Sequence, residues 1–258
     1  RGFAAANNQA IRIARGEHLF LLNPDTRVHC CSLDNLIKAL DANPEAGACA
    51  PKLLKADGTI YHSVKRIVTF RGTLYAKTFF RYLGIFKTHY KNLRPANFNY
   101  DKQAEVEQIS GAAILVKRSV IMEIGPMEEA LFLYYEDVDL CLRIRKAGWA
   151  IIYVPDAVIT HTGGMSSEQI LADRRIIEHK SLLVYLRKHR GKLATAFFIP
   201  LFKTGVIIKE LLDIATGVFT YLFSVVSGDS RGRHKSAVKI KESAAFLAVH
   251  SWEFLLKS

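Results

Sequence analysis

The 258-residue chain has few cysteines, and their placement argues against two common kinds of structural site. The four cysteines are Cys30, Cys31, Cys49 and Cys141, and no two of them form a Cys-x-x-Cys pair. A zinc ribbon needs such pairs, and a disulfide framework needs a regular spacing that this chain lacks. The sequence therefore favours a reducing, cytoplasmic compartment, with most of the cysteines acting as small buried hydrophobic residues.

The chain also lacks a hydrophobic run long enough to cross a membrane. Its longest uncharged run near the C-terminus, residues 214–228, has 15 residues, against the ~20 that a transmembrane helix needs. Residues 1–13 have neither the apolar core nor the length of a signal peptide. This opening reads like the middle of a domain, so we expect further sequence before Arg1. With half of the residues hydrophobic and no low-complexity tract or repeat, the composition indicates a folded chain.

The net charge of +12 is concentrated near the C-terminus. Residues 187–241 contain eleven Lys or Arg against three Asp or Glu. Such a basic stretch suits anionic lipid, nucleic acid or phosphate. No nucleic-acid-binding motif is present, and the charges lie beside an apolar segment rather than beside stacking aromatic residues. We therefore expect an anionic membrane surface as a partner, and no nucleic acid.

Helical and extended patterns alternate over the first 161 residues, which predicts an α/β sandwich. Helices are expected at residues 3–15, 32–41, 118–124 and 136–147, and extended segments at 18–22, 46–50, 149–154 and 158–161.

Four details of these elements are predicted from single residues and short runs. Gly16 is expected to end the first helix, Ser32 to cap the second, and Pro155 to separate the last two strands. The apolar run at residues 18–22 is typical of a buried parallel strand.

The chain divides into two expected domains. Residues 1–190 form a compact α/β domain, and residues 191–258 a basic helical region. Within the first domain, residues 65–105 are rich in aromatic and basic side chains. They are expected to be a long insertion over the sheet, either a loop on the substrate side or plain surface packing.

Three short segments carry residues with chemical potential. Asn23-Pro24-Asp25 follows a strand, where a carboxylate can hold a divalent cation, although the same triplet is also an ordinary turn. Glu136-Asp137-Val138-Asp139 opens a helix, where acidic residues are favoured by the helix dipole but can also supply a general base. His161 follows a strand, and a lone histidine there is more often packed than metal-bound.

Three longer stretches, taken together, resemble the family 2 glycosyltransferases of the GT-A fold, in their rhamnosyltransferase-like branch. They are GFAAANNQAIRIARGEHLFLLNPDT, SGAAILVKRSVIMEIG and FLYYEDVDLCLRIRKAGWAIIYVPDAVITH, and the resemblance spans residues 1–189 except 65–105. It implies a Rossmann-like nucleotide-sugar transferase sandwich that here lacks its first strands, followed by C-terminal amphipathic helices. Because those first strands hold the nucleotide base in the family, we expect the 258-residue chain alone not to transfer sugar.

The resemblance also implies roles for individual residues. Asp137, in the pair with Glu136, matches the catalytic base. Asp25 and His161 match ligands of a divalent metal, Mg²⁺ or Mn²⁺, so we expect the two side chains to converge on one site. The remaining matches are donor-binding positions: Asn8, Asn23, Asp25, Ser110, Gly111 and Ala112. One departure is Gly-Pro-Met-Glu-Glu at residues 125–129, where the family usually has Gly-x-Phe-Asp-Glu, which leaves acceptor positioning there open.

The activity implied by the resemblance is inverting transfer of a sugar, with rhamnose among the candidates, from a nucleotide-diphosphate donor. The acceptor would be a hydroxyl of a glycan or a lipid-linked molecule in cell-surface polysaccharide synthesis. Arg174 and Arg175 are weaker candidates for contact with the diphosphate, since a solvated helix face explains them equally. The alternative function is that of a non-catalytic relative which binds membranes or glycans.

Residues 193–228 have the pattern of an amphipathic helix. Most of their polar residues fall on one side of a helical wheel: Lys203, Lys209, Glu210, Asp213, Thr216, Thr220, Ser224 and Ser227. Such a helix can lie in a membrane interface with its polar side toward water, or pack on the catalytic domain or on a second subunit. We expect the membrane, with the protein peripheral on the inner face of the cell membrane.

Overall fold

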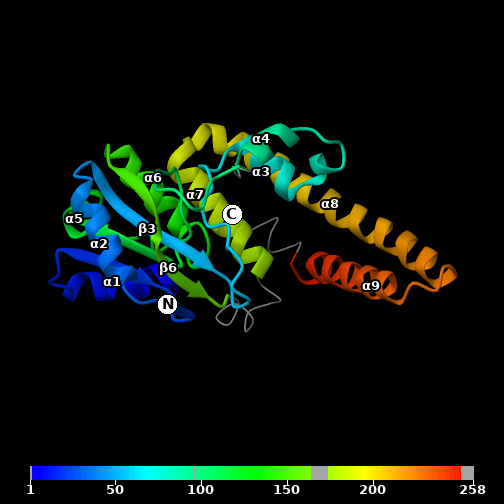
Figure 1. Ribbon diagram of the computed structural model, residues 1–258. Coiled ribbons are helices and arrows are strands. Elements are labelled where there is room, and N and C mark those ends of the chain that lie inside the picture. Colours follow the sequence, from blue (N-terminus) through cyan, green and yellow to red (C-terminus); the bar gives the residue numbers. More distant parts are fainter. Residues whose placement is uncertain (1, 94, 96, 164–173, 251–258) are drawn as a thin grey trace. The chain divides into compact units, whose positions relative to one another are not determined.

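The computed structural model describes residues 2–93, 95, 97–163 and 174–250 (Figure 1). The chain forms two compact units, the first comprising Arg1–Val68 and Asn92–Tyr185, and the second Thr69–Lys91 and Leu186–Ser258. The first unit thus ends close to the boundary expected at residue 190. The segment Thr69–Lys91, expected in an insertion over the sheet, instead belongs to the same unit as the C-terminal helices.

Within the described residues, the first unit is built on a six-stranded mixed sheet. Its strands are β1 (His18–Leu22), β2 (Thr26–Val28), β3 (Ala46–Leu54), β4 (Ala104–Glu105), β5 (Ala113–Lys117) and β6 (Ala150–His161). The order is β1-β5-β3-β6-β2, with β4 also paired to β6. β3 and β6 run parallel, whereas β1–β5, β3–β5, β2–β6 and β4–β6 are antiparallel.

The predicted direction of β1 was wrong. His18 lies opposite Lys117 and Leu22 opposite Ala113, so β1 is antiparallel to β5. Its side chains alternate between buried and half-buried rather than being buried throughout. A short apolar run indicates burial, but it carries no information about the direction of the neighbouring strand.

The last two expected strands are one strand, β6, which continues through Pro155. Along its parallel partner β3, Val154 lies opposite Pro51 and Val158 lies opposite Lys52. Residues 155–157 therefore bulge out of the ladder, and a bulge accommodates a proline because it needs no ladder hydrogen bond there. The opposite edge of β6 pairs with β4 near Ile152 and then with β2 near Ile159.

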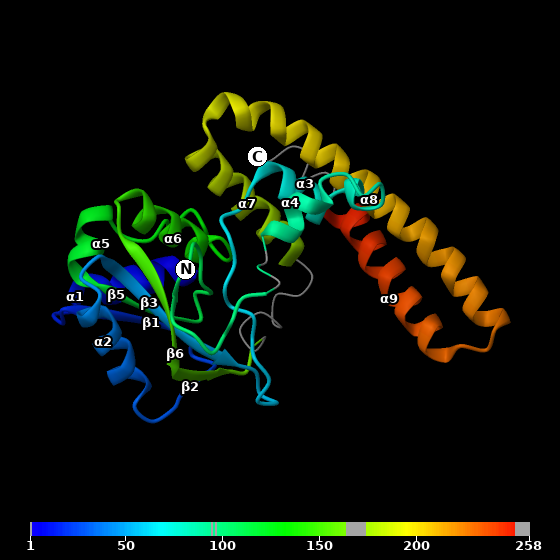
Figure 2. The same cartoon turned by 45° about the horizontal axis from the view of Figure 1, so that its top comes forward.

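Helices cover both faces of the sheet, which confirms the α/β class (Figures 1 and 2). The helices of this unit are α1 (Phe3–Ile13), α2 (Ser32–Ala42), α5 (Arg118–Ile124), α6 (Glu136–Lys146) and most of α7 (Arg174–Arg190). Ala4 of α1, Val120 of α5 and Leu140 of α6 belong to one buried cluster. Leu36 and Leu40 of α2 belong to the cluster on the other face. The predicted helix at 118–124 is confirmed with its bounds unchanged.

Two predicted helix ends were wrong. α1 ends at Ile13, before Gly16. α2 is preceded by Cys31, in the left-handed conformation (φ 61°), instead of being capped by Ser32. The Ser32 hydroxyl donates to the Val158 carbonyl (2.8 Å) and accepts from the Val158 amide (3.0 Å). Because that hydroxyl is occupied, it ties α2 to β6 and does not cap its own helix. All four cysteines are free thiols.

The second unit is helical. It contains α3 (Phe70–Lys77), the 3₁₀ turn η1 (Phe79–Arg81), α4 (Lys87–Asn92), α8 (Lys192–Val226), α9 (Ser230–Ala245) and η3 (Phe246–His250). Phe70 stacks on Phe198 of α8 with ring centroids 4.5 Å apart, and Gly205 of α8 lies close to Thr78. Across the described ranges, no helix has both the length and the apolar composition needed to cross a bilayer.

α8 and α9 form an antiparallel pair joined by a short turn at residues 227–229 (Figure 2). The Asp229 side chain accepts hydrogen bonds from the amides of Arg231 and Gly232 and so caps α9. Gly217 allows close packing, because a Cβ there would lie 2.7 Å from Cγ1 of Ile240.

We predict that Gly217→Leu separates α9 from α8. The larger side chain would overpack this contact, at a cost of about 1–3 kcal/mol. Hydrogen exchange of the α9 amides should become roughly tenfold faster or more. Ala215→Leu, at an exposed position on the same helix, is the control and should leave α9 protected. Unchanged exchange in Gly217→Leu would show that the helices do not depend on this close approach.

Candidate functional site

Two segments of the expected site meet where β1 ends and β5 begins. Because the two strands are antiparallel, the residue after β1 and the residue before β5 lie side by side. The Asn23 amide donates to the Ala112 carbonyl at 2.9 Å. This bond joins the Asn-Pro-Asp turn to the 110–112 segment.

Asp25 and His161 meet across the β2–β6 pair, as predicted. Thr26 lies opposite His161 in the register, which brings the preceding residue next to the histidine. Asp25 Oδ1 and His161 Nε2 are 3.2 Å apart. Thr162 holds the backbone in place, since its amide and its hydroxyl both donate to the Asp25 carbonyl at 3.0 Å. The Asn23 side-chain amide nitrogen lies 3.5 Å from His161 Nε2, so all three residues converge.

The Asp25–His161 pair fits a divalent cation. Asp25 Oδ1 is buried, has no hydrogen-bond partner among the described residues, and faces His161 Nε2. Two ligand atoms about 2.1 Å from one ion, at right angles, are about 3 Å apart, close to the observed separation. In the described part of the chain, no three His, Cys, Asp or Glu side chains gather at one point. An ion here would therefore take further oxygens from a ligand such as a diphosphate.

Asp137 lies at the start of α6 and is held against the 110–112 segment. Its Oδ2 accepts from the Gly111 amide at 2.9 Å, and its Oδ1 accepts from the Val138 amide at 2.8 Å. A Cβ on Gly111 would lie 3.0 Å from the Asp137 Cβ, so this close approach needs glycine. Each carboxylate oxygen keeps a lone pair for another donor. The arrangement fixes the orientation of the carboxylate and leaves it able to accept a proton.

The turn before Asp137 has an unusual backbone. Tyr134 and Tyr135 both have φ of 68°, in the left-handed region that tyrosine seldom adopts. Such residues cost about 1–3 kcal/mol each and persist where the surroundings hold them. The Tyr135 ring packs near Tyr185 of α7, with centroids 5.8 Å apart. Tyr134 accepts a hydrogen bond from Arg174 and lies under its guanidinium group.

Glu136 is a buried carboxyl group beside Asp137. It is 9% exposed, and its Oε2 has no hydrogen-bond partner among the described residues. Burial and the neighbouring charge of Asp137 raise the pKa of Glu136 to about 8. At neutral pH Glu136 is therefore mainly protonated.

The Asn8 side chain is buried and hydrogen-bonded within the protein, whereas a residue that binds a ligand is expected to be open to it. Its amide nitrogen donates to the Met127 carbonyl and to Glu129, and its side-chain oxygen accepts from the Met127 amide, each at 2.9 Å. The structure thus places Asn8 as a brace between α1 and the 125–129 segment. Contact of Asn8 with a donor sugar stays a prediction that requires one of these bonds to break.

Sequence reasoning missed several residues of this site. The Tyr61 ring meets the His161 ring edge-on at 5.8 Å, and its amide bonds to Leu53. The Asp57-Gly58 turn was a sequence signal that the chain folds back on β3 and so brings Tyr61 near the end of that strand. The positive φ of Tyr134 and Tyr135 has no signal in the sequence. Arg174, a candidate from the sequence, contacts Tyr134, and residues 164–173 lie outside the described residues.

The profile of the family described as "Glycosyltransferase like family 2" matches residues 1–176. The N-acetylglucosaminyl-diphospho-decaprenol L-rhamnosyltransferase of Mycobacterium tuberculosis is 33% identical over 183 residues, covering 67% of this chain and 56% of that protein. The low-salt glycan biosynthesis hexosyltransferase Agl10 of Haloferax volcanii is 27% identical over 189 residues, covering 67% of this chain and 55% of that protein.

Among solved structures, the mannosyltransferase PcManGT from Pyrobaculum calidifontis, in complex with GDP-Man and Mn²⁺, is similar with a TM-score of 0.49. It is 18% identical, with 95% of this chain and 66% of that chain covered. The chain spans about half the length of the curated relatives named here.

We predict that Glu136→Gln stabilises the protein in a pH-dependent way. The folded-state pKa of about 8 lies above the ordinary value of 4.5, so the folded state must hold a proton that the unfolded state has lost. The wild type therefore loses stability as pH rises from about 4.5 to 8, by up to about 1.4 kcal/mol per pH unit. Glutamine removes this loss.

Urea unfolding at several pH values measures the effect. The gain from Glu136→Gln should be absent near pH 4, grow up to pH 8 and then level off. Glu45→Gln, at an exposed position, is the control. A gain independent of pH would contradict a buried protonated carboxyl group.

Proposed function

The chain belongs to the glycosyltransferase-like family 2, and we propose on that premise that the protein transfers a sugar from a nucleotide-diphosphate donor to a hydroxyl group. The observation that carries the proposal is that the adjacent residues Gly111 and Ala112 each hold one part of the site. Gly111 binds the Asp137 carboxylate, and Ala112 binds the turn that bears Asp25. A proton acceptor and a site for the diphosphate are thereby attached to one short segment.

Asp137 is the proposed general base. Its two oxygens are oriented by the Gly111 and Val138 amides, which leaves lone pairs for the acceptor hydroxyl. As Asp137 takes the proton, the hydroxyl oxygen attacks the anomeric carbon and the bond to the diphosphate breaks. A single displacement of this kind inverts the configuration of the sugar.

Asp25 and His161 are the proposed ligands of a divalent metal at the diphosphate. Two observations support this role: Asp25 Oδ1 is buried without a hydrogen-bond partner among the described residues, and it lies 3.2 Å from His161 Nε2. A bound Mg²⁺ or Mn²⁺ would offset the negative charge of the leaving diphosphate. Asn23, 3.5 Å from His161, would donate its amide hydrogens to the same phosphate oxygens.

Glu136 has a supporting role in this proposal. Because its pKa is raised to about 8 by burial and by Asp137, it does not compete with Asp137 as the base at neutral pH. A protonated Glu136 can donate a hydrogen bond. Ser110, immediately before Gly111, is half-buried and would line the pocket for donor and acceptor.

The relatives support a class of substrates. One is named as a rhamnosyltransferase acting on a diphospho-decaprenol acceptor, and another as a hexosyltransferase of glycan biosynthesis. For this protein we propose rhamnosyl or hexosyl transfer to a glycan or lipid-linked acceptor in cell-surface polysaccharide synthesis. A lipid-linked acceptor requires the enzyme at a membrane, and we propose a peripheral location on the inner face of the cell membrane.

We predict that Asp137→Asn in the full-length protein abolishes transfer but preserves folding and donor binding. The amide has nearly the same shape and cannot take the proton, so the rate should fall at least about 10²-fold. Transfer is followed by release of the nucleoside diphosphate with an acceptor present. Asp156→Asn, at an exposed position in the β6 bulge, is the control and should remain active. Near-normal turnover by Asp137→Asn would place the base elsewhere.

We predict that Asp25→Asn removes the metal dependence of donor binding. Calorimetric titration with nucleotide-sugars and Mn²⁺ should show wild-type affinity falling in EDTA. The variant should bind at least about tenfold more weakly, with little further change in EDTA. His161→Ala should behave likewise, whereas His234→Ala, exposed on α9, should match the wild type. Wild-type affinity unaffected by EDTA would exclude a metal from donor binding.

A further inference from the structure

The second half of α8 carries a continuous apolar face that is exposed. The exposed large apolar side chains between residues 211 and 226 are Leu211, Leu212, Val218, Phe219, Tyr221, Leu222, Phe223, Val225 and Val226. Apart from Tyr221 and Phe223, which flank it, they recur at the spacing of one side of a helix. Phe219 is 73% exposed and Val226 88%. We call this surface the outer face of α8.

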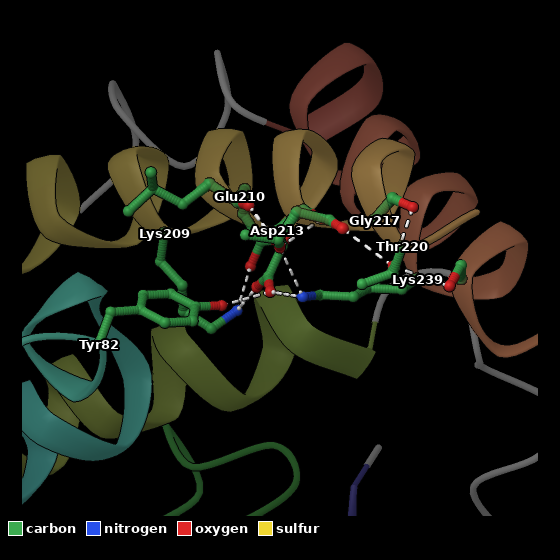
Figure 3. A network of polar contacts seen from close by, with 10 residues as sticks. Tyr82, Lys209, Glu210, Asp213, Gly217, Thr220 and Lys239 are labelled. Atoms are coloured by element: carbon green, nitrogen blue, oxygen red, sulfur yellow. Dashed lines mark hydrogen bonds and ion pairs between the residues drawn. The ribbon is translucent and has the colours of Figure 1, made fainter. Parts of the chain in front are cut away.

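The opposite side of the same helix is polar, small and buried against α9 (Figure 3). Asp213 accepts from Lys209 of its own helix and from Lys239 of α9, each at 2.7 Å. The Thr220 hydroxyl lies 2.9 Å from the Ser236 hydroxyl. In this half of α8 the polar side therefore faces α9 and the apolar side is exposed, the reverse of a helix that faces water on its outer side.

Part of the polar stripe of residues 203–227 is covered by protein. Lys203, Glu210, Asp213 and Ser224 of that stripe are buried. Tyr82, from the segment before α4, also donates to Asp213. The helical wheel correctly placed the polar residues on one side, but it could not tell whether that side meets water or another helix.

Buried polar groups of this network are paired within the protein. Burial acts to raise the pKa of Asp213, but hydrogen bonds from Lys209, Lys239 and Tyr82 outweigh it and lower the pKa to about 2. The carboxylate is thus charged and paired. Helices that associate in lipid use small residues and interhelical hydrogen bonds in the same way, because lipid offers no partners for polar groups.

The other helix of the pair supplies positive charge. Arg231, Arg233, Lys235 and Lys241 of α9 are exposed, and Glu242 is the sole acidic residue in the α9 sequence. Basic residues beside an apolar face suit an anionic lipid surface. The concentration of positive charge on α9 therefore favours an anionic lipid surface as the partner.

We propose that the α8–α9 pair docks on an anionic lipid bilayer, with the outer face of α8 inserted among the acyl chains and the basic residues of α9 at the headgroups. This deepens the membrane location given under the proposed function, and it rests on that function only for its biological purpose. Its physical basis is independent: an exposed apolar face, a satisfied polar interior and an adjacent basic helix.

Vesicle flotation tests the proposal with the full-length protein. The wild type should float with vesicles of an equal mixture of phosphatidylcholine and phosphatidylglycerol, and less with phosphatidylcholine alone. Phe219→Ser combined with Leu222→Ser should weaken binding at least about tenfold. Met122→Ser, which removes an equally exposed apolar side chain from α5 (70% exposed), is the matched control and should float like the wild type. Arg233→Ala and Lys235→Ala should each weaken binding to the mixed vesicles about fivefold.

Three outcomes would overturn the proposal. The wild type could stay in solution with both vesicles, or the Phe219→Ser/Leu222→Ser variant could float normally. The wild type could also sediment as a dimer that this variant dissociates, which would make a second copy the partner. Transfer of sugar to a short water-soluble acceptor separates this proposal from the proposed function. The variants of α8 and α9 should retain that activity, because they change only membrane binding. Normal flotation without any transfer would count against the function and support the docking.

Discussion

A hydrogen bond from the Gly111 amide to the Asp137 carboxylate holds the candidate site together, since the neighbouring residue, Ala112, accepts from the amide of Asn23. One short segment before β5 thus binds the start of α6 on one side and the end of β1 on the other. The absence of a side chain at residue 111 permits the contact, because a Cβ would approach the Asp137 Cβ to 3.0 Å. Displacement of this segment would move the proposed base and the proposed phosphate site together. The relative placement of the two groups is therefore set by the segment that leads into β5.

The turn at Tyr134 and Tyr135 also positions Asp137, because it leads directly into α6. Two left-handed tyrosines in succession are costly, yet they direct the chain so that α6 begins with Glu136 buried and Asp137 facing Gly111. Asn8 supports the preceding loop by occupying both the amide and the carbonyl of Met127. The strained turn and the Asn8 hydrogen bonds thus both support the loop that leads to Asp137. Strain at the turn is compensated by packing around it.

Parts of this arrangement were predictable from the sequence, and others were not. The proximity of Asp25 and His161 was predicted from the resemblance and is confirmed by their 3.2 Å separation, although their role with a metal stays a proposal. The α/β class followed from alternating apolar patterns, because burial of side chains has a period that the sequence displays. The direction of β1 was not predictable, since five apolar residues fit either kind of neighbour. The orientation of the α8 polar stripe was equally hidden, because a pattern shows which residues share a side but not what covers it.

The bulge in β6 has a consequence for the evolution of the chain. Residues 155–157 are inserted between Val154 and Val158, whose partners on β3 are adjacent. Beyond the bulge, successive side chains point to opposite faces of the sheet. His161 therefore reaches Asp25 only with the present number of residues in the bulge. Gain or loss of a single residue at the bulge would exchange the positions of Thr160 and His161. Surface loops ordinarily accept changes of length between homologous proteins, but at this bulge an insertion or deletion of one residue would separate His161 from Asp25.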